Sequence, residues 1–97
     1  MSNQFGNKVR QLREQNNLLL RQVAPLLEID SPQLSKIERG ERQAKKDLIP
    51  LFAEILKISK DELQTLWLAD QLLDVIKGEP MGDEALKSVT KKIKKKK

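Results

Sequence analysis

Residues 20–40, LRQVAPLLEIDSPQLSKIERG, decide the fold of this 97-residue chain. They contain two short segments whose apolar residues recur at helical spacing, separated by a tight break. The first segment, residues 20–28, predicts a helix with Val23, Ala24 and Leu27 on its inner face. The pattern as a whole predicts one short helix held rigidly against another.

The second segment carries residues that suit both ends of a helix. Asp30 is a good N-cap, and Pro32 suits the first turn, where a missing N–H costs little. Leu34 and Ile37 then face inward, and Gly40 follows the last turn, where a left-handed residue can end a helix. We therefore expect a helix that begins after Asp30 and ends before Gly40.

Four more helices are predicted outside this segment. One starts near Ser2 or Asn3. Another is capped by Asp47 and carries an apolar stripe of five residues: Leu48, Leu51, Phe52, Ile55 and Leu56. A longer one is capped by Ser59 and ends near Gly78, and a short one covers about residues 82–93. No segment is typical of a strand, so the sequence predicts an all-α fold.

The composition excludes several kinds of chemistry. The chain has no Cys and no His, which rules out thiol chemistry, disulfides, Cys/His zinc sites and imidazole catalysis. It contains no paired carboxylates in an apolar setting, no nucleophile beside a base and no phosphate-binding loop. We therefore expect a protein that is not an enzyme and uses no metal or cofactor.

No part of the sequence is typical of a membrane or export segment. No apolar run approaches the length of a membrane span. The first ten residues, MSNQFGNKVR, lack the apolar centre of a signal peptide. We therefore expect a cytoplasmic protein without a membrane partner.

The net charge of +5 is unevenly distributed along the chain. Residues 87–97 hold seven Lys and no acidic residue. Residues 1–46 hold nine basic and five acidic residues, whereas residues 47–86 hold three basic and nine acidic ones. A basic first half beside an acidic second half indicates one face for a polyanion and another for a different partner.

Several stretches of sequence share the pattern of a known family. They are Phe5…Val9…Leu12-Arg13, Val23-Ala24, Ile29-Asp30-Ser31, Leu34-Ser35-Lys36-Ile37-Glu38-Arg39-Gly40 and Ile58…Asp61-Glu62-Leu63. Because of them, about residues 5–68 resemble the lambda-repressor-like helix-turn-helix family, also called the XRE or Cro/CI type. Within that family the chain looks most like the controller proteins encoded beside restriction-modification genes, which bind operators as dimers.

The resemblance implies a five-helix DNA-binding domain, here with an extended fifth helix and a short additional C-terminal helix. We expect the DNA-binding domain to cover residues 1–68 and a dimerising helical extension to cover residues 69–93. The Lys-rich tail at residues 94–97 is expected to be disordered. The resemblance further implies that the helix at residues 20–28 crosses the DNA backbone and that the helix after Asp30 lies in the major groove.

The resemblance implies base contacts from Ser31, Gln33 and Lys36, at the start of the recognition helix. Gln33 can bond adenine through N6 and N7, and Lys36 can donate to guanine O6 and N7. Phosphate contacts are expected from five basic residues, most of them in a flexible loop after that helix: Arg21, Arg39, Arg42, Lys45 and Lys46. The alternative is that these side chains form a solvated surface without a role in binding.

Arg13 and Glu38 match a family pair that bonds between the first helix and the end of the third. The alternative is two independent surface charges. Three residues depart from the family pattern. Leu19 stands where a Ser or Thr cap is common, and Leu20 stands where a Gln that contacts DNA is common. Neither leucine can do those jobs, and Pro25 predicts that the second helix starts late or bends.

The long helix after Ser59 changes its apolar face along its length. Leu63, Leu66 and Trp67 share one narrow arc and are expected to pack on the body. The opposite side holds Ala69 and four residues that we expect to form a dimer interface: Leu68, Leu72, Val75 and Ile76. That side needs a partner, which could be a second subunit, the C-terminal helix with Leu86, Val89 and Ile93, or both. The alternative is an intrachain helical hairpin in a monomer.

Together these features predict a homodimeric, sequence-specific transcriptional regulator that binds a double-stranded, pseudo-palindromic DNA operator. RNA polymerase or another protein is left open as a further partner. The alternative is an antitoxin, or another protein-interaction module, that binds a protein through its acidic second half and regulates its own operator.

Overall fold

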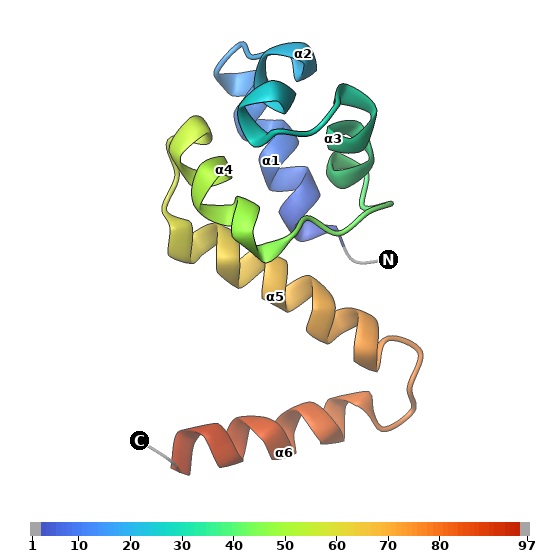
Figure 1. Cartoon of the computed structure of the whole chain (residues 1–97). Helices are drawn as coiled ribbons and strands as arrows, with labels where there is room; N and C mark the ends of the chain where they lie inside the picture. The colour runs from blue at the N-terminus through green and yellow to red at the C-terminus, as the bar shows by residue number, and fades with distance from the viewer. Residues whose placement is uncertain (1–2, 96–97) are drawn as a thin grey trace.

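A computed structural model describes residues 3–95 and contains six α-helices, with no strand in that range (Figure 1). The helices are α1 (Gln4–Gln15), α2 (Leu20–Val23), α3 (Ser31–Glu38), α4 (Ile49–Leu56), α5 (Lys60–Ile76) and α6 (Gly82–Lys95). There are also two 3-10 turns. The turn η1 (Ala24–Leu27) directly follows α2, and the turn η2 (Lys46–Leu48) directly precedes α4. The all-α fold predicted from the sequence is confirmed.

The core lies among α1 to α4 and the first half of α5. Its largest fully buried side chains come from all of these elements and from η1: Val9, Val23, Leu27, Leu34, Ile49, Phe52, Leu56 and Leu63. The rings of Phe5 and Phe52 meet edge to face with centroids 5.5 Å apart, a favourable geometry for an aromatic pair. Leu66 and Trp67 pack against this core with partly buried side chains, as the helical arc predicted.

α1 and α3 lie so close together that position 6 requires glycine. A Cβ on Gly6 would lie 2.5 Å from the carbonyl oxygen of Ile37 and 2.7 Å from that of Glu38. Beside this contact, Nδ2 of Asn3 donates to the Glu38 carbonyl oxygen over 2.9 Å. The start of α1 therefore holds the C-terminal end of α3 by backbone contact and by a hydrogen bond.

Both ends of α3 are formed as the sequence predicted. Oδ1 of Asp30 accepts a hydrogen bond from the Gln33 N–H over 2.8 Å, which caps the N-terminus. Gly40 has a φ of +76°. Its N–H donates to the Ile37 carbonyl, and the next N–H, of Glu41, donates to the Lys36 carbonyl. These two bonds form a Schellman ending, which satisfies the last carbonyls of the helix.

The predicted helix over residues 20–28 is wrong beyond Val23. α2 ends there, and the chain continues as the 3-10 turn η1, with Pro25 in its opening positions. Proline has no N–H to donate to the α-helical ladder, which explains why the regular helix stops. Glu28 then takes a left-handed conformation with a φ of +58° and ends the turn.

The predicted start of the fourth helix is also wrong. Asp47 lies inside η2 and does not cap α4, whose N-cap position is Leu48 and has no side-chain hydrogen bond. The turn η2 leads directly into α4, so the chain enters the helix without a polar cap. The buried face of α4 also differs, because Leu51 is exposed and the inner positions are Ile49, Phe52, Ala53 and Leu56.

α5 begins and ends as predicted, and its second half extends away from the rest of the domain. Oγ of Ser59 accepts the Glu62 N–H over 3.3 Å, and the helix ends before Gly78, which has a φ of +79°. Only Leu63 of α5 is fully buried, so the second half of the helix projects away from the core (Figure 1).

α6 turns back below α5 but does not close on it (Figure 1). It packs against no other helix extensively within residues 3–95, and its apolar side chains Leu86, Val89 and Ile93 are exposed. The described residues therefore do not form the closed intrachain hairpin that the sequence allowed. α6 extends to Lys95, so it reaches into the segment for which the sequence predicts disorder. The last two residues of that predicted tail lie outside the described range.

The close approach of α1 to α3 gives a first prediction. Replacing Gly6 with Ala should lower the free energy of unfolding by about 1–3 kcal/mol, because the added methyl group overpacks the contact with the α3 carbonyls. Ala would otherwise favour a helix over Gly by about 1 kcal/mol, so a net loss identifies the contact. Urea unfolding followed by circular dichroism measures it, with Gln11→Ala at an exposed position of α1 as the control. A stabilised G6A variant would contradict the packing described.

Candidate nucleic-acid interface

The first two turns of α3 present polar side chains outward. Leu34 and Ile37 face the core, whereas Gln33 is half-buried and Lys36 is exposed. Gln33 and Lys36 are three residues apart, which places them on the same side of the helix. Ser31 is half-buried at the first helical position, offset from that side. α3 therefore has one apolar side fixed in the core and one hydrogen-bonding side that faces solvent.

The predicted phosphate contacts are all exposed, and they lie on α2 and on the segment that follows α3. Arg21 is on α2, and Arg42, Lys45 and Lys46 lie between α3 and the end of η2. Arg39 is not a free cation, because its Nε lies 2.7 Å from Oε2 of Glu41. Both partners of this pair are more than half exposed, so solvent weakens the attraction between them.

The loop after α3 is tied to α5. Ala44 is 3% exposed, and its carbonyl oxygen accepts a hydrogen bond from Nε1 of Trp67 over 2.8 Å. A buried anchor in its middle differs from the flexible basic loop that the sequence suggested. Lys45 directly follows this anchor and Arg42 lies two residues before it, so both basic residues are close to a point of attachment to α5.

Arg13 connects α1, α3 and the loop that enters α2. Its Nε and Nη2 donate to the two carboxylate oxygens of Glu38 over 2.7 and 3.0 Å. Its Nη1 donates to the carbonyl oxygen of Leu18 over 2.8 Å. One side chain of α1 therefore holds the last residue of α3 and the residue that precedes the α2 cap position.

This ion pair is removed from solvent. Arg13 is 9% exposed and Glu38 is 5% exposed. The hydrogen bonds with Glu38 raise the pKa of Arg13 above its ordinary value, although burial acts in the opposite direction. The guanidinium therefore stays charged within the pair.

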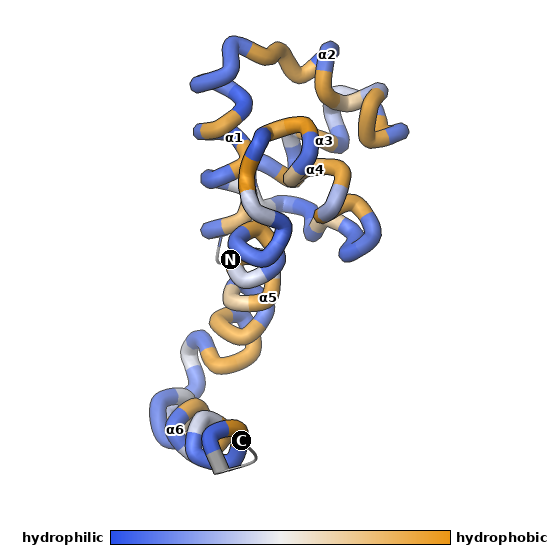
Figure 2. The backbone as a smooth tube through the Cα atoms, turned by 90° about the vertical axis from the view of Figure 1, so that its left-hand side faces the viewer, coloured by the Kyte–Doolittle hydropathy of each residue, from blue (hydrophilic) through white to orange (hydrophobic). Residues whose placement is uncertain are grey.

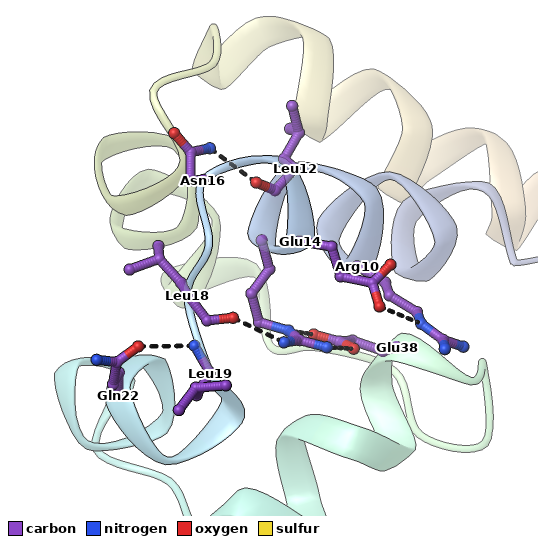
Figure 3. A network of polar contacts seen from close by, with 9 residues as sticks. Arg10, Leu12, Glu14, Asn16, Leu18, Leu19, Gln22 and Glu38 are labelled. Atoms are coloured by element: carbon purple, nitrogen blue, oxygen red, sulfur yellow. Dashed lines mark hydrogen bonds and ion pairs between the residues drawn. The ribbon is translucent and has the colours of Figure 1, made fainter.

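The N-cap position of α2 is occupied by Leu19 and not by a polar residue. The hydrocarbon side chain of Leu19 cannot accept a hydrogen bond, so it cannot cap the helix. Instead Oε1 of Gln22 reaches back and accepts the N–H of Leu19 over 2.8 Å (Figure 3). The spacing of three residues between Leu19 and Gln22 was a local signal that could have identified this contact. Leu20 packs partly against the core, whereas Leu19 is 46% exposed.

Asp70 makes a contact that sequence analysis missed. Its two carboxylate oxygens accept the backbone N–H groups of Gln4 and Phe5, each over 2.9 Å. A side chain of α5 therefore caps the N-terminus of α1, more than sixty residues away in the sequence. No local pattern could have indicated this contact, and the same holds for the bond between Trp67 and Ala44.

The described residues contain no group of acidic side chains that could hold a metal ion. None of the helices within residues 3–95 is long and apolar enough to cross a membrane.

Comparison with known proteins identifies one similarity. A family model described as a helix-turn-helix domain matches residues 4–66, which is more than half of the chain. No curated protein and no solved structure matches significantly. The matched range begins with α1 and ends within α5, so it includes α2, α3 and the Arg13–Glu38 pair.

The buried ion pair gives a second prediction. Arg13→Met or Glu38→Leu alone should lower the free energy of unfolding by about 3–5 kcal/mol, because each leaves one buried charge without its partner. The double variant should lose less than either single variant, which urea unfolding of all four proteins measures as a coupling energy. Arg10→Met and Glu14→Leu form the control cycle, because their ion pair on the same helix is exposed and should couple weakly. Equal coupling in the two cycles would remove the role assigned to Arg13.

Proposed function

Because this chain belongs to the helix-turn-helix domain family, we propose that it is a sequence-specific transcriptional regulator that binds a pseudo-palindromic operator as a homodimer. The observation that supports this proposal most directly is that α3 is held in place at its ends and has a polar outer side. This helix is capped at both ends, and its last residue is fixed by Arg13, while its outer side carries Gln33 and Lys36. A rigid helix with a polar outer side suits insertion into the major groove.

In the proposed complex, the first two turns of α3 contact base edges. Gln33 recognises adenine through a paired hydrogen bond, and Lys36 donates to guanine. Ser31, at the first helical position, contacts a neighbouring base or phosphate. Asp30 uses Oδ1 of its carboxylate to cap α3.

The basic residues around α3 make the proposed phosphate contacts. Arg21 lies on one side of α3 in sequence, and Arg42, Lys45 and Lys46 lie on the other. The anchoring of Ala44 to Trp67 supports this assignment, because a fixed loop can set the register of the helix in the groove. Arg39 joins these contacts by exchanging Glu41 for a phosphate, an exchange that the exposure of the pair allows.

This assignment gives a third prediction. In selections from random duplexes, Gln33→Ala and Lys36→Ala should each relax specificity at one position of the operator, at a cost of about 1–3 kcal/mol. Lys45→Gln and Lys46→Gln should instead weaken binding to all sequences alike and reduce the salt slope by about one unit per lost contact. Lys57→Gln, at the exposed end of α4, is the control for loss of one positive charge. Unchanged specificity in both α3 variants would refute the proposed base contacts.

The proposed dimer forms through the projecting half of α5. Leu68, Leu72 and Val75 are 50%, 51% and 74% exposed, and Ile76 adjoins them as a half-buried residue. Apolar stretches continue along α5 outside the body (Figure 2). A surface of this kind is unusual for a monomer and typical of an interface. Leu73 extends it as a residue that the sequence analysis did not assign.

α6 extends the proposed interface. Its exposed Leu86, Val89 and Ile93 lie at helical spacing, and they do not cover α5 of the same chain. Pairing of two copies would bury both apolar surfaces and place the two α3 helices about one DNA turn apart. We therefore assign residues 1–68 to DNA binding and residues 69–93 to dimerisation. The narrower assignment to restriction-modification controllers is supported by the sequence resemblance alone.

The dimer gives a fourth prediction. The double variant Leu72→Ser, Val75→Ser should sediment as a monomer at micromolar concentration, because it removes apolar area from the centre of the interface. Its affinity for the complete operator should fall by about 10²-fold or more, since the two half-sites are no longer bound by a linked pair. Leu51→Ser, at another exposed leucine, should leave both properties unchanged. A wild-type protein that sediments as a monomer well above micromolar concentration would exclude the dimer.

A further inference from the structure

Asp70 is on the side of α5 that faces the body. Its carboxylate binds the N–H groups of Gln4 and Phe5, at 2.9 Å from Oδ1 and 2.9 Å from Oδ2. The residue before α1, Asn3, makes no side-chain cap to this helix. Its Nδ2 instead donates to the Glu38 carbonyl at the end of α3. α5 therefore supplies the cap that α1 lacks.

These contacts link α3 to α5 through a few residues at the start of α1. The end of α3 is bound by Asn3 and touches Gly6, and the neighbouring residues Gln4 and Phe5 are bound by Asp70. Phe5 is only 4% exposed, so this part of α1 cannot shift without disturbing the core. Both α3 and α5 are thus bound to the same short segment at the start of α1.

The opposite side of α5 carries the proposed dimer surface. Leu68 and Leu72 are two residues before and after Asp70, which places them on the far side of the helix. Their exposure confirms that they face away from the body. One turn of α5 therefore binds the start of α1 on one side and presents apolar side chains to solvent on the other.

We propose that Asp70 is a positioning residue that sets the angle between α5 and α3, and thereby the spacing of the two half-sites that the dimer accepts. This inference rests on the homodimer proposed above. Half-sites one turn apart are about 34–36 Å from centre to centre, and one inserted base pair moves and rotates one site relative to the other. A dimer in which the angle between α5 and α3 is fixed cannot adapt to the altered spacing. A dimer in which that angle can vary is able to adapt.

α5 keeps other attachments when the Asp70 carboxylate is removed. Leu63 is fully buried, Trp67 remains bonded to Ala44, and Lys8 remains within 3.7 Å of Glu62. All of these contacts lie before Asp70 on α5. Variants at Asp70 are therefore expected to fold, with α5 held less tightly against the start of α1.

The test measures binding of the full chain to its selected operator and to versions with one base pair added or removed between the half-sites. We expect the wild type to lose at least about tenfold in affinity for each altered spacing, because DNA must be deformed to fit a rigid dimer. Asp70→Asn and Asp70→Ala should lose less than about threefold, because the angle between α5 and α3 can now adapt in place of the DNA. Base preference within each half-site and the sedimenting mass should stay unchanged. Glu54→Gln, which removes an equal charge from an exposed position of α4, should behave as the wild type.

Two results would overturn the inference. One is a spacing preference in the Asp70 variants as strict as in the wild type. The other is unchanged amide hydrogen exchange at Gln4 and Phe5 in Asp70→Ala, since loss of the cap should accelerate exchange at those two N–H groups. Failure of the proposed function would appear differently, as a wild type that is monomeric or selects no operator. The amide measurement needs no DNA, so it separates the two failures.

Discussion

The buried pair of Arg13 and Glu38 is the interaction on which the rest of the structure depends. The guanidinium uses three nitrogens to bind both Glu38 oxygens and the carbonyl of Leu18, so α1, the end of α3 and the entry to α2 meet at one side chain. No buried side-chain nitrogen or oxygen within the described residues lacks a hydrogen-bond partner. Buried ion pairs often contribute little net stability, because desolvation offsets the attraction. Here the planar fork of Arg13 specifies a geometry, and that geometry fixes where α3 stands.

α1 holds α3 from both of its own ends. Its last turns provide Arg13, and its first turn provides Asn3 and the glycine at position 6. All of these contacts reach the C-terminal end of α3, and none of them involves Ser31 or Gln33 near its start. In the proposed complex, packing and base recognition do not compete, because Leu34 and Ile37 face the core while Gln33 and Lys36 lie on the outer side of α3.

Local signals in the sequence predicted much of this architecture, and long-range contacts escaped it. Asp30, Gly40 and Ser59 act on groups within a few residues of themselves, so their roles follow from spacing alone. Asp47 failed as a cap because the chain enters α4 through a 3-10 turn that continues into the helix. The buried face of α4 was misassigned because tertiary packing, and not helical periodicity alone, decides that Leu51 stays outside. The contacts of Asp70 and Trp67 join distant segments, and only the folded chain brings them together.

In a single chain, the second half of α5 and the whole of α6 have apolar side chains that no other helix within residues 3–95 covers. A helix with an unpaired apolar side gains little from folding alone, and its stability comes mainly from packing. In the proposed dimer, this packing and operator binding are one coupled process. Two half-sites are filled only when two chains have paired, so occupancy of the operator rises more steeply with protein concentration than it would for a monomer. Apolar residues such as Leu72 and Val75, which never touch DNA in this arrangement, would then determine the concentration at which the regulator acts.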